Sequence, residues 1–235
     1  MEKYIAATGG RERYEAVHTM ELKAEVSGEL NPNLIVSTMP VRANQTGVLE
    51  TYSAAPNRHV SITEYAGRRG VDASGCDGQR AWYAVGGLGL RQETKGKLFE
   101  SMCVPMFDFP LHWRERFKKA EFRGAKRVSG REMLVVRLSY AEDNYVDNYF
   151  DAQSYFLLQQ VRVHKISGAI LRITASYSDF RMVDGGLIFP FHTVQESDQI
   201  PARSATPTHR ASSNVLSIKL NVPIDPAIFK APIQH

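Results

Sequence analysis

Acidic and phenolic side chains alternate along one short segment, in a pattern that could serve acid and base chemistry or bind a cation. Asp143, Tyr145, Asp147, Tyr149 and Asp151 are each two residues apart, so on a β-strand they project from one face. Exposure of that face to water is the simpler interpretation. Asp151 also fits a turn opener, because Asp side chains accept hydrogen bonds from backbone amides two residues on. We retain Asp147 as a catalytic candidate for the case that the protein is an enzyme.

Histidines supply the other candidates for proton transfer. Of the seven, His59, His164 and His192 lie in segments with strand character, where each could point inward. A single histidine on a strand is more often a structural group than a catalytic one. If the protein is an enzyme, we expect His164 and His192 to act with Asp147.

Signatures of cofactor, metal or nucleophile chemistry are otherwise missing. The sequence contains no G-x-S-x-G elbow, H-E-x-x-H helix, C-x-x-C pair or phosphate loop. Cys76 and Cys103 lack the paired spacing of a zinc site. They leave two alternatives open: one disulfide in an oxidising compartment, or two buried thiols. We expect no cofactor and no metal.

Composition and charge describe an ordinary globular protein. The 235 residues are 43% hydrophobic and 23% charged, with a net charge of +4, and no dense basic block indicates a nucleic-acid footprint. No apolar run approaches the ~20 residues that cross a bilayer, and no signal peptide is visible at the N-terminus. The most basic stretch predicts a solvated surface, with contact to a membrane surface or anionic lipid as the alternative; it contains Lys118, Lys119, Arg123, Lys126 and Arg127.

Elements that position these residues are mostly β-strands. Apolar and polar residues alternate in short segments that turn residues separate, as in Leu134–Tyr140 and Leu216–Val222. The connections are too short for crossover helices, which favours antiparallel hairpins. We expect one domain over residues 1–235, mainly β, with about eleven strands in a strongly curved antiparallel half-barrel. The other nine expected strands are 17–26, 34–41, 48–53, 58–65, 81–85, 145–150, 158–166, 170–177 and 187–195.

Helical patterns are few and short. A helix over 2–8 should end at Gly9-Gly10, because glycine adopts the left-handed conformation that stops a helix. Two further helices are expected over 95–103 and 108–118, and together they would form a helical lid over about 95–118. The second carries an aromatic stripe of Phe109, Trp113 and Phe117, which is either ordinary core or the apolar underside of that lid. Residues 197–213 predict a long mobile loop.

Five short motifs, each weak by itself, follow one another along the chain. They are a helix with a double glycine at 4–10, Asp77-Gly78 with Trp82, Tyr149-Phe150-Asp151, Ser178–Arg181 with Val183–Pro190, and the closing segment Leu220–Phe229. The ordered set resembles the outer-membrane lipoprotein carrier superfamily, which contains the periplasmic lipoprotein carrier and its outer-membrane receptor. The resemblance implies an unclosed β-barrel of about eleven antiparallel strands, lidded by helices, whose concave apolar face accepts acyl chains or other hydrophobic ligands.

Three functions follow from this shape. The first is a carrier or sensor in the cell envelope that binds a lipid, a lipoprotein acyl group or another apolar small molecule, with contact to a membrane or lipoprotein; it is periplasmic if a signal peptide has been removed and cytoplasmic otherwise. The second is an enzyme that uses the same cavity to cyclise or isomerise a hydrophobic substrate. The third is a structural module whose cavity side chains fill. The expected ligand-binding residues are Tyr83, Leu98, Phe99, Met102, Phe109, Trp113, Phe117, Val136, Leu138, Ile173 and Phe191.

Overall fold

A computed structural model describes most of the 235-residue chain. The described residues are 1–28, 45–67, 71–85, 89–94, 103, 105, 107, 109–166, 169–200 and 209–232. The statements below concern these residues. Leu98, Phe99, Met102, the expected helix 95–103 and the expected strand 34–41 lie outside them, apart from Cys103.

Thirteen strands form a single antiparallel sheet within the described ranges. Its order is β6-β5-β4-β3-β2-β1-β13-β12-β11-β10-β9-β8-β7, so every neighbour pair except β1–β13 is also consecutive in the chain. The strands are β1 Thr19–Gly28, β2 Thr46–Ala54, β3 Arg58–Tyr65, β4 Val71–Cys76, β5 Ala81–Val85, β6 Gly89–Glu93, β7 Lys119–Val128, β8 Arg131–Ala141, β9 Asn144–Asp151, β10 Leu157–Ile166, β11 Ala169–Met182, β12 Ile188–Ile200 and β13 His209–Leu220.

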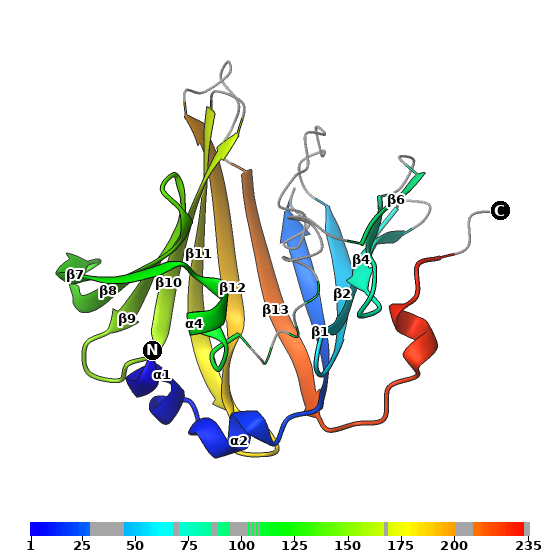
Figure 1. Cartoon of the computed structure of the whole chain (residues 1–235), viewed down its shortest axis with the longest axis horizontal. Helices are drawn as coiled ribbons and strands as arrows, with labels where there is room; N and C mark the ends of the chain where they lie inside the picture. Colours follow the sequence, from blue (N-terminus) through cyan, green and yellow to red (C-terminus); the bar gives the residue numbers. More distant parts are fainter. Residues whose placement is uncertain are drawn as a thin grey trace.

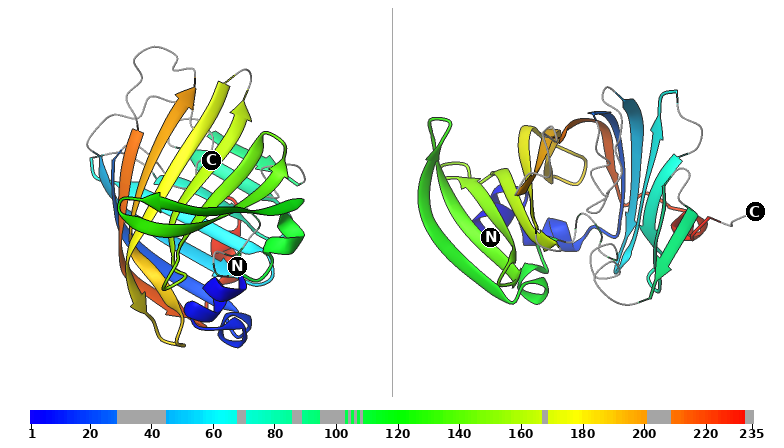
Figure 2. Two further views of the ribbon diagram at one scale, coloured as in Figure 1. Left: turned by 90° about the vertical axis from the view of Figure 1, so that its left-hand side faces the viewer. Right: turned by 90° about the horizontal axis from the view of Figure 1, so that it is seen from above.

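The sheet curves until its two ends face each other without joining (Figures 1 and 2). One wall consists of β1 to β6 and the other of β7 to β11, and β12 and β13 connect them at the back. The edge strands β6 and β7 are consecutive in sequence but lie at opposite edges of the sheet. The segment between these two strands, residues 94–118, is here called the insert; its described residues are 94, 103, 105, 107 and 109–118. The expected half-barrel of antiparallel strands is confirmed.

Three strands were not expected, namely β4, β6 and β7. β6 and β7 are rich in charged and polar residues, as edge strands tend to be, because a charged edge discourages pairing with another chain. Polarity hides such strands from an alternation pattern. The other ten strands were expected at these places, so the count rises from about eleven to thirteen.

The expected loop over 197–213 is partly wrong. β12 continues to Ile200 and β13 begins at His209, and the two strands pair from His192 with Asn214 to Ser197 with His209. Ser197 is buried, and its polar character concealed the continuing strand. Leu216 also departs from the simple alternation: a bulge opposite Lys23 and Ala24 shifts the register, and Leu216 is 52% exposed.

Two short helices close one end of the half-barrel (Figure 1). α1 (Glu2–Ala7) and α2 (Arg11–Glu15) flank Gly9 and Gly10, which both have positive φ angles, so the expected helix stop is confirmed. A Cβ on Gly9 would lie 2.7 Å from the side chain of Leu187, which shows how closely the helix end approaches the β11–β12 turn. The backbone N–H of Ile188 donates to Thr8 O at 2.9 Å.

The C-terminal segment covers the outer, convex face of the first wall. Its 3-10 helix η1 (Pro226–Phe229) begins at Asp225, whose carboxylate accepts from the backbone N–H of Ala227. Phe229 is buried with Val60 and Trp82, and the Trp82 indole N–H donates to Phe229 O at 2.9 Å. The convex face of this wall is thus a core in its own right.

Candidate functional site on the concave face

The concave face is defined by the side chains that pack against the N-terminal helices. Leu22, Ile218 and Phe191 share one buried cluster with Ile5 of α1 and Tyr14 of α2. Residues paired across neighbouring antiparallel strands point to the same face, so the register extends this face across both walls. One row on the first wall runs through Ile218, Leu22, Thr51, Ser61, Ser74 and Tyr83. One row on the second wall runs through Leu138, Val146, Arg162, Ile173 and Ser197.

Apolar side chains dominate the centre of this face. Met20, Leu22, Ala24 and Val26 of β1 are all buried there, and Phe191 of β12 joins them. Every second residue of β1 contributes, as expected for a strand with one buried face. This apolar cluster is the natural contact surface for a hydrocarbon chain.

Polar side chains replace apolar ones farther along the first wall. The set, here called the polar belt, lies on β2, β3 and β4, and every member is buried. Its members pair across these strands, so they share the concave face. They are Thr51, Ser53, His59, Ser61, Thr63, Asp72 and Ser74.

His59 is the centre of a hydrogen-bonded chain in the belt. Its Nδ1 lies 2.9 Å from Ser53 Oγ and its Nε2 lies 3.1 Å from Ser61 Oγ, which is in turn 3.1 Å from Thr51 Oγ1. Burial lowers the pKa of His59 from 6.5 to about 4, because the charged imidazolium is poorly solvated there. His59 is therefore neutral near pH 7, donating through one ring nitrogen and accepting through the other.

Thr63 differs from its neighbours in the belt. Its side chain is fully buried, and its Oγ1 has no hydrogen-bond partner among the described residues. It pairs with Leu49 of β2 on one side and with Asp72 of β4 on the other. A buried hydroxyl without a partner costs about 1–3 kcal/mol.

The second wall carries its own polar ladder on the concave face. The Tyr177 hydroxyl donates to Gln160 Oε1 at 2.9 Å, and the Gln160 amide donates to Asn148 Oδ1 at 2.8 Å. Asn148 in turn donates to the backbone oxygens of Val136 and Val146. Burial raises the pKa of Tyr177, so this phenol stays protonated. The ladder is mutually satisfied and joins four strands.

The insert packs onto the concave face through aromatic side chains. Phe107 belongs to the central apolar cluster, and Phe117 packs against Leu138 and Val146. Phe109 and Trp113 are half-buried beside Phe117, with the rings of Phe109 and Phe117 edge-to-face at 6.0 Å. The Trp113 indole N–H has no acceptor within the part of the chain that the structure describes.

The expected helix over 108–118 is shorter than its pattern suggested. Only α4 (Trp113–Arg116) is helical, and residues 109–112 form turns. Tertiary packing of the aromatic side chains takes the place of a longer helix. The aromatic residues nevertheless meet on one side, as the stripe predicted.

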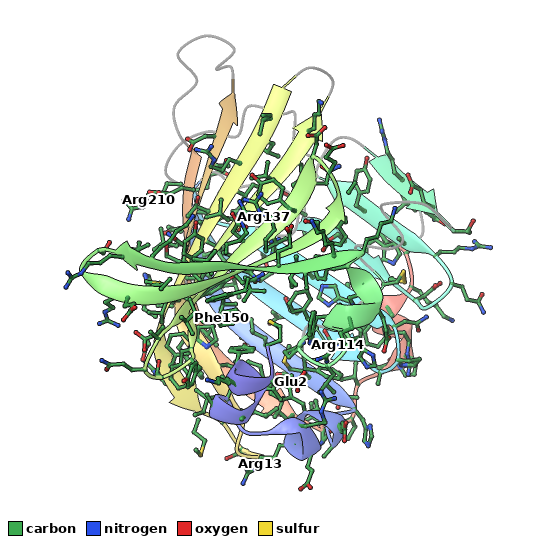
Figure 3. The ribbon with its side chains drawn as sticks, turned by 60° about the vertical axis from the view of Figure 1, so that its left-hand side comes forward. Glu2, Arg13, Arg114, Arg137, Phe150 and Arg210 are labelled. Atoms are coloured by element: carbon green, nitrogen blue, oxygen red, sulfur yellow. A yellow bond between two sulfur atoms is a disulfide. The ribbon has the colours of Figure 1, made fainter. Side chains whose placement is uncertain are left out.

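Two links hold the insert in place. A disulfide joins Cys103 to Cys76, which is buried on the concave face of β4 beside His59. At the other end Arg114 of α4 donates to Glu2 of α1 at 2.8 Å (Figure 3). The Arg114–Glu2 pair is exposed and contributes little, so the disulfide is the stronger anchor.

The expected ligand-binding residues within the described ranges all lie on the concave side. Tyr83, Val136, Leu138, Ile173 and Phe191 do so by strand register. The three from the insert, Phe109, Trp113 and Phe117, pack onto that face. The polar belt was not expected as a site, although His59 was noted as a strand histidine.

The three candidate catalytic residues do not come together. Asp147 lies on the convex face, where Arg137 Nε and Nη2 each donate to its carboxylate at 2.7 Å; Figure 3 shows Arg137 on this wall. His192 also points outward and bonds Asn214 through Nδ1 at 2.7 Å. Only His164 shares the concave face, through its pairing with Leu171. The Asp147 ion pair is structural, and the convex face holds Tyr145 stacked under Arg137 at 3.6 Å.

Asp151 acts as the turn residue that its context predicted. Its carboxylate accepts from the backbone N–H groups of Gln153 and Ser154, and the bond from Ser154 lowers the pKa of Asp151. Asp143 sits in the preceding turn and pairs with Lys165. The alternating acidic segment is therefore a set of separate structural contacts. Across the described ranges, no three His, Cys, Asp or Glu side chains are grouped to hold a metal ion.

Comparisons with solved structures identify this arrangement. A LolA superfamily protein from Nitrosomonas europaea superimposes with a TM-score of 0.59 over 97% of both chains at 11% identity. A putative outer membrane lipoprotein-sorting protein domain from Vibrio parahaemolyticus gives a TM-score of 0.57 over 93% of this chain and 92% of that one, at 9% identity. The chain has the unclosed β-barrel fold of the lipoprotein-sorting proteins.

This lipoprotein-sorting fold extends beyond those two structures. A DUF1329 family protein from Desulfovibrio piger matches with a TM-score of 0.57 over 97% of this chain and 94% of that one, at 9% identity. No protein-family model matches the chain, and no curated protein sequence matches it. At these identities the likeness establishes the fold and leaves function to the side chains.

Proposed function

We propose that the protein is a carrier or sensor that binds a hydrophobic ligand, a lipid or an acyl chain, on the concave face beneath the insert. The proposal rests on which parts of the chain cover this face. In the described ranges its apolar cluster meets no second sheet; it meets α1, α2 and aromatic side chains of the insert. Because one chain segment bridges the open side, the cover can move without breaking the sheet.

Phe107 and Phe117 occupy the concave face in this structure, and a ligand would take their place. Such an exchange costs little net free energy, since one apolar contact replaces another. Each methylene group of a ligand buried there contributes about 0.8 kcal/mol, so an acyl chain can bind without a charged anchor. The insert then acts as a lid, and its closed form fills the site when the ligand is absent.

The disulfide supports a location in the cell envelope. Disulfides persist in oxidising compartments such as the bacterial periplasm and are rare in the cytosol. Cys76 and Cys103 form one, which favours the periplasmic alternative over the cytoplasmic one. An envelope location agrees with a lipid or lipoprotein partner.

An enzyme that uses the same face is the weaker alternative. Two of its three expected catalytic residues, Asp147 and His192, point away from the concave face. His59 lies on that face, but both of its ring nitrogens bond to serine hydroxyl groups. This arrangement binds and positions more readily than it transfers protons.

Removal of the Trp113 side chain tests the proposed lid. Trp113→Ala is expected to weaken binding of the uncharged fluorescent probe N-phenyl-1-naphthylamine at least fivefold, about 1 kcal/mol, because the half-buried ring covers the ligand. The melting temperature should change less. Trp82→Phe on the convex core is the control and should lower the melting temperature with unchanged probe affinity. Lipid extraction after native mass spectrometry identifies a bound ligand; a protein that is empty and also fails to bind the probe contradicts the proposal.

We further propose that the second wall meets an anionic membrane surface through its edge. β7 carries Lys119, Arg123, Lys126 and Arg127, all exposed, and Phe122 is 67% exposed between them. Each basic residue near an anionic leaflet contributes about 1 kcal/mol, and an aromatic side chain can insert among the headgroups. The edge borders the insert, so a lipid could pass from the bilayer to the concave face.

Charge reversal on β7 tests the membrane contact. Arg123→Glu with Lys126→Glu is expected to reduce co-sedimentation with vesicles of 30% phosphatidylglycerol at least tenfold, since about two attractive contacts become repulsive. Arg80→Glu with Lys230→Glu removes the same charge from the other wall and should bind nearly as well as the unaltered protein. An equal loss in both variants would mean that net charge alone drives the association.

A further inference from the structure

We propose that the ligand is an amphiphile with an uncharged, hydrogen-bonding polar end, and that this end binds to the polar belt of the first wall. The inference rests on the proposed function and adds the chemical class of the ligand. Its apolar chain would lie on the neighbouring cluster of β1, β12 and β13. The belt and the cluster share one face, because Thr51 pairs directly with Leu22.

The belt reverses the pattern of an ordinary core strand. On β3, Val60 and Ile62 point to the convex face and pack under the C-terminal segment, while His59, Ser61 and Thr63 point to the concave face. Both sets are shielded from water except for the half-buried Ile62. Wall residues with a purely structural role would be more stable as apolar side chains. Hydroxyl groups at these positions are explained by contact with a polar group of the ligand.

The hydroxyl group of Thr63 indicates independently that a ligand group binds at the belt. Its hydroxyl is fully buried and has no partner within the described residues, although it faces the same space as the satisfied hydroxyls. A hydroxyl offers one donor and two acceptor lone pairs. A ligand hydroxyl or ester carbonyl beside Leu49 and Asp72 would satisfy it.

The charges of the belt select an uncharged polar end. The seven members of the belt include no Lys or Arg that could pair with a ligand carboxylate or phosphate. His59 adds no positive charge near pH 7, because burial lowers its pKa to about 4. Arg91 lies two strands from Ser74 on the same row, but it is exposed at the edge of the sheet. A ligand hydroxyl or ester group suits Thr63, since the threonine hydroxyl both donates and accepts hydrogen bonds.

Two ligands with equal chains but different polar ends test the proposal. We would displace N-phenyl-1-naphthylamine from the full chain at pH 7.5 with 1-monolauroylglycerol and with laurate. The glyceride is expected to bind at least fivefold more tightly than laurate. Thr63→Val should reduce that preference about three- to tenfold, which is the range for one hydrogen bond. The same variant should melt about 2–4 °C higher, because it removes an unsatisfied buried hydroxyl without changing side-chain volume.

Matched variants separate ligand binding from packing. Thr63→Ser keeps the hydroxyl and should retain the preference for the glyceride. Thr8→Val alters a buried threonine outside the belt, which bonds Tyr14, and should lower stability with an unchanged preference. If Thr63→Val does not fold, Ser61→Ala gives the same readout of preference.

The outcomes distinguish this inference from the function on which it rests. Equal affinity for laurate and the glyceride, or an unchanged preference in Thr63→Val, overturns the assignment of the polar end and leaves the carrier intact. Tighter binding of laurate also overturns it. Failure of the probe and both ligands to bind overturns the proposed function itself.

Discussion

Lowering the pH from 6.5 to about 4 is expected to destabilise the protein by roughly 3 kcal/mol through His59 alone. The folded pKa of His59 is about 4, against 6.5 for an unperturbed histidine. Between these values the unfolded chain binds a proton that the folded protein does not, so the free energy of unfolding rises with pH. In this range the free energy of unfolding changes by about 1.4 kcal/mol per pH unit. The stabilisation is complete above pH 6.5 and is lost on acidification towards pH 4.

A glutamine at this position removes the titration and keeps hydrogen-bonding groups for Ser53 and Ser61. Urea unfolding of His59→Gln across pH 4 to 7 should show a flatter pH dependence than the unaltered protein, with the difference due to His59. Carboxylates titrate in both proteins and cancel in this comparison. His192→Gln, on the convex face, is the matched control for replacing a histidine with glutamine outside the belt. Parallel curves for His59→Gln and the unaltered protein would show that His59 is solvated.

Reduction of the Cys76–Cys103 disulfide is expected to lower the free energy of unfolding by about 3–4 kcal/mol. The bond closes a loop with a sequence separation of 27, and that cost follows from the loop entropy that the cross-link removes from the unfolded chain. The same bond anchors the insert to β4. Reduction should therefore also speed entry of N-phenyl-1-naphthylamine.

A double variant separates the cross-link from side effects of the reductant. Cys76→Ala with Cys103→Ala should unfold at the urea concentration of the reduced protein, and dithiothreitol should then have no effect. Alanine suits position 76, since this side chain is fully buried and a serine hydroxyl would need a partner. Coincident unfolding curves for oxidised and reduced protein would show that the insert is held by its aromatic contacts.

Strands with one apolar face could be located from the sequence with good accuracy. Ten of the expected segments became strands, because alternation reports directly on which side of a strand is buried. β4, β6 and β7 were missed. The edge strands β6 and β7 are rich in charged residues, and β4 consists mostly of small residues, which give no alternation of large apolar and polar side chains. β12 was cut short for the same reason, since Ser197 is buried although serine is usually exposed.

The site could be predicted only in its apolar part. Ile173 and Phe191 were assigned to the concave face, and register places them there. Asp147 and His192 were candidates for catalysis on condition that they point inward, and both point outward. Alternation along a strand divides its residues into two faces. When both faces are buried, as on β3, the alternation does not tell which of them lies on the concave side. The polar belt remained hidden, because Ser and Thr are also typical of exposed strand faces.

The sequence by itself determined the antiparallel character of the protein, the helix stop at Gly9-Gly10 and the turn at Asp151, because each depends on neighbouring residues. Only the tertiary structure decided that Asp147 pairs with Arg137 outside, that Cys103 reaches Cys76, and that seven polar side chains gather on the concave face. These contacts join strands and segments whose proximity arises from sheet curvature and from the crossing of the insert between β6 and β7. Such proximity is a property of the whole sheet, and no local pattern encodes it.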